Sequence, residues 1–357
     1  MSTSSGQISS MPTGGGPSGG GTTTGPVLAV DDLHVEFRQR SGVVNAVNGI
    51  SYTVDAGETL AILGESGSGK SVSAQAIMGI LDTPPAVITG GGIHFQGRDI
   101  LTMSEEDQRQ IRGPGISMIF QDALSSLNPV YSVGYQIGEM FRVHRGTSKK
   151  EAKQKAVELM DRVRIPAAAR RVDDYPHQFS GGMRQRVMIA MALALDPRIL
   201  IADEPTTALD VTVQAQVMDL LKDLQRDTGM ALILITHDLG VVNEVADRVA
   251  VMYAGKIVET GTVDDVFTKP AMPYTVGLMN SIPLVEAKGG RLNPIVGQPP
   301  NLANIPSGCP FHPRCPKART GVDAAPGRDC VTDVPPLRTV TIGREAACHY
   351  AEEVLHA

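Results

Sequence analysis

The chain contains the sequence Gly64-Glu65-Ser66-Gly67-Ser68-Gly69-Lys70-Ser71 directly after the apolar run 59–63. This stretch fits the pattern G-x-x-x-x-G-K-[ST], whose glycines let the backbone turn so that several N–H groups point at phosphate oxygens. A helix expected from about Ser71 adds the positive end of its dipole. We therefore predict a phosphate-binding loop between a strand and a helix.

The residue types at the end of the loop indicate a nucleoside triphosphate with Mg²⁺. Lys70 supplies a mobile cation for the β- and γ-phosphates, and Ser71 supplies a hydroxyl for the metal. By chance the pattern should arise in roughly one chain in a hundred of this length, and its place between a strand and a helix makes chance a weaker explanation. The expected nucleotide contacts run from Gly64 to Ser71 and include Val72.

A second element consists of the apolar run 199–202 followed by Asp203 and Glu204. A strand that ends in two acids places Asp203 at the carboxyl edge of a sheet, where it can hold Mg²⁺ through water. Glu204 then faces the position of an attacking water and can polarise it as a general base. Taken alone, the run could equally be a core strand followed by two solvated acids, but the phosphate loop upstream favours the catalytic interpretation.

Composition limits the function classes. The 357 residues are 42% hydrophobic and 20% charged, with a formal net charge of -6, which is ordinary for a soluble globular protein and gives no support for a nucleic-acid binder. No apolar run approaches the roughly 18–20 residues needed to span a bilayer, so any membrane work falls to other chains. We see no secretion signal and expect the cytosol, where disulfides are rare.

The chain divides into three parts by composition. Residues 1–26 are almost entirely Gly, Ser, Thr and Pro and are expected to be disordered. Residues 27–271 alternate apolar strands with helices, which predicts an α/β fold with a mainly parallel sheet. Residues from about 122 to 176 form a helical insertion, in which Ser148 and Glu151 make a capping box. Residues 272–357 are rich in Pro and Cys and form an appended small module. The predicted strands are 28–37, 50–54, 59–63, 116–120, 199–202 and 232–235, and the predicted helices include 71–81 and 148–163.

The run Phe179-Ser180-Gly181-Gly182-Met183 closely resembles the signature sequence of ATP-binding cassette proteins. Physically, Ser180 precedes two glycines and a helix, and an open helix N-terminus is an anion site. The run lies about 20 residues before the acidic strand, as it does in that family. The resemblance implies a P-loop ATPase cassette with a RecA-like mixed sheet, an antiparallel β subdomain and a helical subdomain.

Four further residues follow the order of the same family, and the resemblance covers about residues 28–270. It implies that Gln121 senses metal and water and binds Mg²⁺, and that His237 contacts the γ-phosphate. By the same resemblance, Asp210 belongs to the loop Ala208-Leu209-Asp210 at the nucleotide, and Phe37 stacks on adenine. The expected catalytic residues are then Glu204, His237, Gln121 and Lys70, and Asp203 and Ser71 complete the magnesium site.

The resemblance also implies partners. In this family two cassettes face each other head to tail, and each ATP lies between one phosphate loop and the other chain's signature helix. The motifs around 118–129 and 183–190, with the tail 308–315, are similar to the dipeptide and oligopeptide importer branch. That implies a second ATPase chain, two transmembrane permeases, an extracytoplasmic binding protein, and a place on the cytoplasmic face of the membrane.

Two alternatives stay open. A soluble cassette ATPase acting in translation or DNA metabolism would usually carry two cassettes or a large coiled-coil or zinc insertion, and neither feature is present. A nucleotide-binding regulator without turnover is disfavoured because Glu204 and His237 are both present.

The cysteines of the chain all fall within its last 49 residues. Their spacings of 6, 15 and 18 residues match neither ferredoxin patterns nor most zinc sites. The residues alone therefore leave zinc, an iron–sulfur cluster and disulfides open, with His312 and His349 as further zinc ligands. The resemblance to the importer branch implies one [4Fe–4S] cluster, with Zn²⁺ as the alternative. Its expected ligands are Cys309, Cys315, Cys330 and Cys348.

Overall fold

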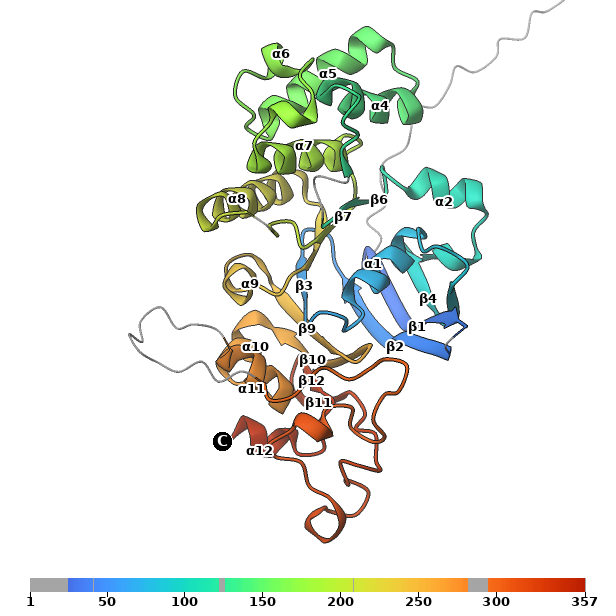
Figure 1. Ribbon diagram of the computed structural model, residues 1–357, viewed down its shortest axis with the longest axis vertical. Coiled ribbons are helices and arrows are strands. Elements are labelled where there is room, and N and C mark those ends of the chain that lie inside the picture. Colours follow the sequence, from blue (N-terminus) through green and yellow to red (C-terminus); the bar gives the residue numbers. More distant parts are fainter. Residues whose placement is uncertain (1–24, 41, 122–125, 208, 282–294, 357) are drawn as a thin grey trace, which may run out of the picture.

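The computed structural model describes residues 25–40, 42–121, 126–207, 209–281 and 295–356. Most of the tail predicted to be disordered, residues 1–24, lies outside the described residues, and so does Ala208. Figure 1 shows a central sheet with a helical layer at one end, a small second sheet at its side and the C-terminal segment at the other end.

The main sheet has eight strands in the order β11-β12-β10-β9-β3-β8-β7-β6. Its bounds are β3 Thr59–Leu63, β6 Ile116–Ile119, β7 Ile199–Asp203, β8 Ala231–Ile235, β9 Arg248–Tyr253, β10 Lys256–Thr262, β11 Arg338–Thr341 and β12 Arg344–Ala346. The strands from β9 to β6 pair in parallel. Every residue of β3, β7 and β8 is buried, which explains their continuous apolar sequences, since helices cover both faces of a parallel sheet.

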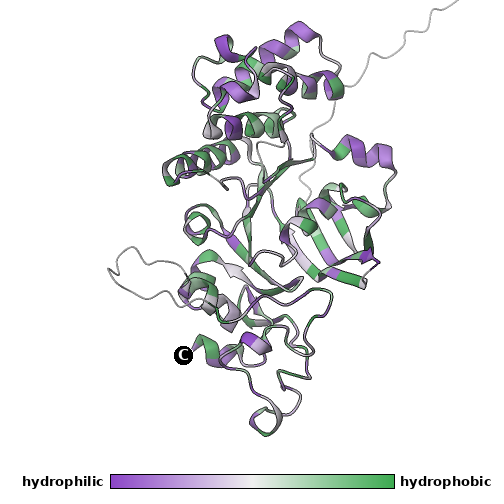
Figure 2. Ribbon diagram, viewed as in Figure 1, coloured by the Kyte–Doolittle hydropathy of each residue, from purple (hydrophilic) through white to green (hydrophobic). Residues whose placement is uncertain are grey.

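A second, antiparallel sheet has the order β2-β1-β4-β5. Its strands are β1 Leu28–Gln39, β2 Gly42–Val54, β4 Ala86–Phe95 and β5 Arg98–Asp99. The buried side chains of β1 (Leu28, Val30, Leu33 and Val35) alternate with more exposed ones except at an irregularity between Val30 and Leu33, and they pack with α1 (Lys70–Met78) and one face of the main sheet in a shared core. Because its other face carries polar side chains, this sheet shows the alternation expected of an antiparallel sheet that is covered on one side (Figure 2).

The helical layer lies beyond β6 and β7 at one end of the molecule (Figure 1). It contains α4 (Val133–Arg145), α5 (Lys149–Arg162), α6 (Ala168–Arg171) and α7 (Gly181–Leu193). Side-chain caps begin three of these helices, because Ser132, Ser148 and Ser180 each accept a hydrogen bond from a backbone N–H three residues on. The apolar faces of these helices form one core with α8 (Val211–Thr228).

The other helices of the described residues are short. They are α2 (Glu105–Ile111), α9 (Leu239–Val245), α10 (Val263–Thr268), α11 (Pro273–Asn280) and α12 (Ala351–Leu355), with short 3₁₀ turns at 100–102, 176–178, 312–314 and 321–323. Figure 2 shows α2 as almost wholly hydrophilic, in keeping with the absence of buried residues in it. No described helix has both the length and the apolar character needed to cross a bilayer.

These observations confirm the predicted α/β cassette class, with one feature that the sequence did not indicate. The composition predicts an appended module over residues 272–357, whereas β11 and β12 extend the main sheet beyond β10. At this junction the buried Glu259 of β10 accepts a hydrogen bond of 2.7 Å from Nη2 of Arg344 in β12. The C-terminal segment (residues 295–356, hereafter the C-terminal module) is therefore joined to the cassette through backbone pairing and a buried ion pair.

Candidate functional site

The phosphate loop follows β3 and is shaped by glycines at positions where no other residue fits. Gly64 has φ of 152°, and a Cβ there would lie 2.3 Å from the carbonyl oxygen of Met252. Gly69 has φ of 104°, and a Cβ there would lie 2.3 Å from the carbonyl oxygen of Ala46. The loop is thus wedged between β9 and β2, and its backbone geometry requires glycine at both ends.

Lys70 lies at the first turn of α1 with its side chain folded into the loop. Its Nζ donates hydrogen bonds of 2.8 Å to the carbonyl of Gly64 and 2.9 Å to the carbonyl of Glu65. Burial lowers the pKa of Lys70, while the nearby carboxylates of Glu204, Asp203 and Glu65 oppose that shift. The ammonium group is therefore held against the backbone of the loop that we predict to bind phosphate.

Two of the three predicted magnesium ligands, Ser71 and Asp203, lie side by side, whereas the third, Gln121, contacts Glu204. Oγ of Ser71 donates a hydrogen bond of 3.1 Å to Oδ1 of Asp203, the last residue of β7. Burial raises the pKa of Asp203, and the Ser71 hydrogen bond opposes this. In the same loop, Oγ of Ser68 is buried without a hydrogen-bond partner. Hard oxygen donors beside an unsatisfied hydroxyl and a glycine cradle fit a magnesium–triphosphate group.

Glu204 is the point where the catalytic side chains meet. It has φ of 46°, and its N–H donates to the carbonyl of Ile235 at 2.8 Å. Its Oε2 accepts hydrogen bonds from Nε2 of Gln121 at 2.7 Å and from Oγ1 of Thr207 at 2.9 Å. Its Oε1 lies 3.4 Å from Nδ1 of His237. Strained, left-handed backbone at a non-glycine residue is a feature of functional sites.

The structure therefore brings the predicted residues Gln121, Glu204 and His237 together at the carboxyl edge of the main sheet, and sequence reasoning missed one neighbour. Gln121 follows β6, Glu204 follows β7 and His237 follows β8, so parallel strands deliver all three to one edge. Thr207, which donates to Glu204, was not predicted, because a threonine in a polar loop carries no distinctive pattern.

The signature residues lie elsewhere in the fold. Ser180 caps α7 and accepts from the N–H of Met183 at 3.4 Å. A Cβ on Gly182 would lie 2.5 Å from Cγ1 of Val213, so this glycine lets α7 pack closely on α8. In Figure 1, α7 belongs to the helical layer, apart from α1 and the phosphate loop. Within one chain these two groups of residues do not form one site.

Asp210 and Phe37 have local roles in the described structure. Oδ1 of Asp210 caps α8 by accepting from the N–H of Val213 at 2.9 Å. Phe37 lies in β1 between Val44 of β2 and Ala86 of β4 and is partly buried against the core cluster. Their predicted contacts with the nucleotide stay predictions.

The prediction of a metal centre on the four cysteines is wrong. Among the described residues, no group of three or more His, Cys, Asp or Glu side chains could hold a metal ion, and the cysteines are free. All four belong to, or pack against, an apolar cluster that contains Phe311. Burial raises the pKa of Cys309 to about 11 and of Cys348 to about 12, so both side chains are neutral thiols within this apolar cluster.

The zinc alternative is wrong for the same reason. Nδ1 of His312 lies 3.0 Å from the carbonyl oxygen of Cys309, and Nε2 of His349 lies 2.9 Å from that of Asp333. One nitrogen of each ring thus contacts the backbone, and the described His and Cys side chains do not form a group of three or more that could hold zinc. The four cysteines lie close together in the sequence because they pack in or against the same apolar cluster around Phe311.

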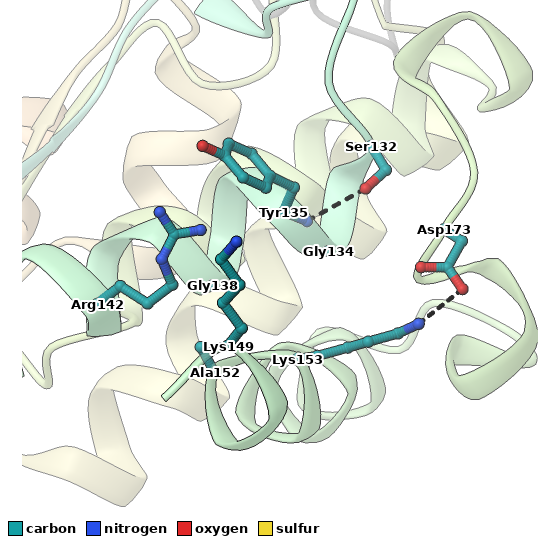
Figure 3. A pocket seen from close by; sticks show the side chains of 9 residues that line it. All are labelled: Ser132, Gly134, Tyr135, Gly138, Arg142, Lys149, Ala152, Lys153 and Asp173. Carbon is teal, nitrogen blue, oxygen red and sulfur yellow. Dashed lines mark hydrogen bonds and ion pairs between the residues drawn. The ribbon is translucent and has the colours of Figure 1, made fainter. Parts of the chain in front are cut away.

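A pocket of about 230 Å³ in the helical layer is separate from this site (Figure 3). It lies between α4 and α5, where Nζ of Lys153 pairs with Asp173 at 2.7 Å. Arg142 and Lys149 also line it. None of the residues around Glu204 or in the phosphate loop lines this pocket, so we do not assign it to the nucleotide.

Comparison with known proteins identifies the family. A model of the ABC transporter family matches residues 47–207, and a model described as the oligopeptide/dipeptide transporter C-terminal region matches residues 258–321. The dipeptide transport ATP-binding protein DppD of Bacillus subtilis is 52% identical over 86% of this chain and 92% of its own length. This chain belongs to the ABC transporter family.

Other relatives agree. The oligopeptide transport ATP-binding protein OppD of Salmonella typhimurium is 50% identical over 92% of this chain and 95% of its own length. Among solved structures, the dimeric post-hydrolysis state of the ATP-binding cassette MJ0796 bound to ADP and Pi superposes with a TM-score of 0.60 at 26% identity, over 66% of this chain and 98% of that chain. CbiO1 from Clostridium perfringens gives 0.57 at 30% identity, over 71% and 95%. The cassette of this ABC protein thus has the fold of ATP-hydrolysing relatives.

Proposed function

We propose that this chain is the ATP-hydrolysing subunit of an importer of dipeptides or oligopeptides. The supporting observation is the group of Gln121, Glu204 and His237 beside the Ser71–Asp203 pair. Because the carboxylate of Glu204 receives hydrogen bonds from two side chains, it is oriented to accept a proton from water at the γ-phosphate. The cargo class is supported by the names of the relatives, which are dipeptide and oligopeptide transport proteins.

In this proposal the chain's own residues bind and orient the nucleotide. Backbone N–H groups of the phosphate loop and Nζ of Lys70 hold the phosphates, and Ser71 and Asp203 would hold Mg²⁺. Bound Mg²⁺ supplies positive charge that neutralises the developing charge on the phosphate oxygens. His237, with a side chain 67% exposed, is free to turn toward the γ-phosphate. Phe37 would stack on the adenine.

A second cassette completes the site. Ser180, Gly181 and Gly182 open α7 in the helical layer, so they would reach the phosphate loop of another chain rather than their own. Asp210, at the start of α8, would lie at the same interface between the two cassettes. A partner cassette of the same or a different sequence is therefore part of the proposed ATPase.

We also propose where a permease binds. A cleft of about 510 Å³ lies between β6, α4 and α7 and has a mostly apolar lining. Phe120 lines it, is 42% exposed and directly precedes Gln121. An apolar cytoplasmic segment of the permease that fills this cleft would contact Phe120, which is adjacent in sequence to Gln121, the residue that donates to Glu204. The other apolar lining residues include Met118, Ile119, Met140, Met188 and Met191.

The function is tested by uptake. A strain that lacks this chain should lose import of di- and oligopeptides, and the wild-type chain but not Glu204→Gln should restore it. Uptake of another solute class restored by this chain, with no effect on peptides, would refute the cargo assignment.

The docking cleft has its own test. Met140→Lys should weaken co-purification with the permeases, because it places a charge in the apolar cleft. Val143→Lys lies on the same helix but is 70% exposed and outside the cleft, so it should leave co-purification unchanged. Equal behaviour of the two variants would place the permease elsewhere. The alternative of a soluble ATPase in translation or DNA metabolism predicts no permease association at all.

A further inference from the structure

Arg314 of the C-terminal module reaches into the phosphate loop. Its Nη1 and Nη2 donate to the two carboxylate oxygens of Glu65 at 2.6 and 2.9 Å. The two residues are 249 positions apart in the sequence. The Arg314 side chain is only 6% exposed, and its bond with Glu65 raises its pKa further above the ordinary range. This is a two-point, charge-assisted contact, which fixes orientation as well as distance.

The remaining N–H donors of the Arg314 guanidinium also have hydrogen-bond partners. Nε donates to the carbonyl of Val296 at 3.1 Å, and Nη2 also donates to that of Gly297 at 3.3 Å. Nη1 lies 3.4 Å from the hydroxyl of Tyr253 at the end of β9. Because each donor of a rigid planar fork has a partner, Arg314 itself has little freedom to move. The carboxylate of Glu65 is therefore tied to a fixed point.

Glu65 is also held through its backbone. Its N–H donates to the hydroxyl of Tyr274 in α11 at 2.9 Å, and its carbonyl accepts from Nζ of Lys70 at 2.9 Å. Tyr274 packs against Tyr253 and Phe311 with ring centroids 4.5 and 5.4 Å away. Phe311 lies three residues before Arg314, so the same aromatic group supports both contacts with Glu65.

The C-terminal module touches the cassette near the loop at a second point. The N–H of Asn45 in β2 donates to the carbonyl of Leu302 at 3.2 Å, and the neighbouring Ala46 carbonyl is the group that Gly69 approaches. The C-terminal module thus braces both the start of the phosphate loop and the strand that flanks its end.

We propose that Arg314 is a positioning residue of the ATP site and that, through Glu65, the C-terminal module sets the conformation of the phosphate loop. This rests on the proposed nucleotide site. A phosphate loop binds by aiming several backbone N–H groups at once, so a residue that fixes the loop affects ATP affinity without touching ATP. A purely structural ion pair would instead contribute to folding stability and leave ATP affinity unchanged.

The test compares arginines of the same module in the full-length chain. Arg314→Ala should weaken binding of Mg-ATP, measured at equilibrium with a fluorescent ATP analogue, by about tenfold. In the complex with its partner cassette and permeases, KM for ATP should rise more than kcat falls. Arg314→Lys, which keeps the charge but loses the fork, should recover part of the affinity. Arg319→Ala is the matched control, since Arg319 pairs with Glu353 and has no contact with the loop, and its ATP affinity should equal that of the wild type.

A double-mutant cycle assigns the effect to the Glu65 contact. If Arg314 acts through Glu65, the double variant Arg314→Ala with Glu65→Gln should lose much less ATP affinity than independent effects predict. Independent effects would make its fold-loss equal to the product of the fold-losses of the two single variants. Independent effects, an unchanged affinity in Arg314→Ala, or an equal loss in Arg319→Ala would each overturn the proposal. If Arg314→Ala does not fold, Arg314→Lys and Arg314→Gln give the same measurement. Lys70→Ala distinguishes failure of the proposed nucleotide site from failure of the proposed role of Arg314. If Lys70→Ala leaves ATP affinity unchanged, the nucleotide site itself is misplaced. If Lys70→Ala loses ATP binding while Arg314→Ala binds ATP normally, only the role of Arg314 is refuted.

Discussion

Nε2 of Gln121 donates a 2.7 Å hydrogen bond to Oε2 of Glu204. Gln121 follows β6, and the preceding Phe120 lines the apolar cleft beside the helical layer. A displacement of the segment at Phe120 would therefore move the amide that orients the carboxylate. If a permease docks in this cleft as proposed, the contact gives a short physical path from the permease to Glu204, the proposed general base.

Glu204→Gln should abolish turnover while ATP binding is retained. The substitution removes the base but keeps the shape of the side chain and leaves the phosphate loop intact. We expect kcat to fall by a factor of about 10² to 10⁴, measured as phosphate release from the transporter with both cassettes present. ATP should accumulate in a closed pair of cassettes.

The matched control for this prediction is Glu106→Gln. Glu106 lies on the hydrophilic helix α2 with its side chain 67% exposed, so turnover should not change. Because an active partner cassette can mask the loss, the equivalent acid of each cassette is changed separately and then in both cassettes together. Hydrolysis at close to the wild-type rate in the doubly substituted transporter would contradict the assignment of Glu204.

Lys70→Ala should weaken ATP binding itself. The variant removes the cation nearest the β- and γ-phosphates and also the hydrogen bonds of Nζ to the carbonyls of Gly64 and Glu65. A charge-assisted contact of this kind corresponds to a loss of about tenfold or more in affinity. Equilibrium binding of Mg-ATP measures it, with Lys153→Ala in the helical layer as control. Unchanged affinity in Lys70→Ala would count against the phosphate loop.

The isolated chain should be a poor ATPase. In the proposed composite site two cassettes are needed, because α7 lies in the helical layer, apart from the phosphate loop of the same chain (Figure 1). Hydrolysis per mole of chain should rise with concentration or on addition of the partner cassette, and Ser180→Arg should suppress this rise without reducing ATP binding by the isolated chain. High activity independent of concentration in a chain shown to be monomeric would disprove the composite site.

Much of the candidate site at the carboxyl edge of the main sheet could be predicted, because each of its segments has a recognisable pattern within a few consecutive residues. Gly64 to Ser71, and the apolar strand that ends at Asp203, carry patterns within a few residues, and the parallel sheet then brings them together. The strand bounds 59–63 agree with β3 itself, since an unbroken buried run has a sharp end at the first glycine.

The contacts of the C-terminal module could not be predicted in the same way. Arg314 and Glu65 are 249 positions apart in the sequence. Arginine and glutamate are common on protein surfaces, so no local sequence pattern indicates that these two residues form a pair. The cysteines misled for a related reason. Spacing in the sequence does not reveal whether a thiol is aimed at a shared metal or packed in an apolar cluster, and here Cys309 and Cys330 are buried in the core around Phe311.

Breaking the Glu259–Arg344 pair should destabilise the protein without changing ATP affinity. Glu259 is fully buried, and Arg344 is 3% exposed. The Glu259 carboxylate also accepts from the N–H groups of Ala271 at 2.7 Å and Met272 at 3.1 Å, so it fastens the main sheet to the start of α11 as well as to β12. Removing one partner leaves an uncompensated buried charge, which costs about 3–5 kcal/mol. Glu259→Ala should lower the free energy of unfolding by that amount in urea titrations.

The exposed pair Arg338–Glu352 in the same module provides the comparison for this last prediction. Both side chains are substantially exposed, and pairs of this kind contribute about 0–1 kcal/mol, so Arg338→Ala should shift the urea midpoint only slightly. The residues that bond to Glu259 do not include any that we assign to the nucleotide site, so Mg-ATP binding by folded Glu259→Ala should match the wild type. A midpoint equal to that of Arg338→Ala would show that the buried pair does not fasten the module. A normal midpoint with weakened ATP binding would instead place Glu259 in the coupling between the module and the phosphate loop.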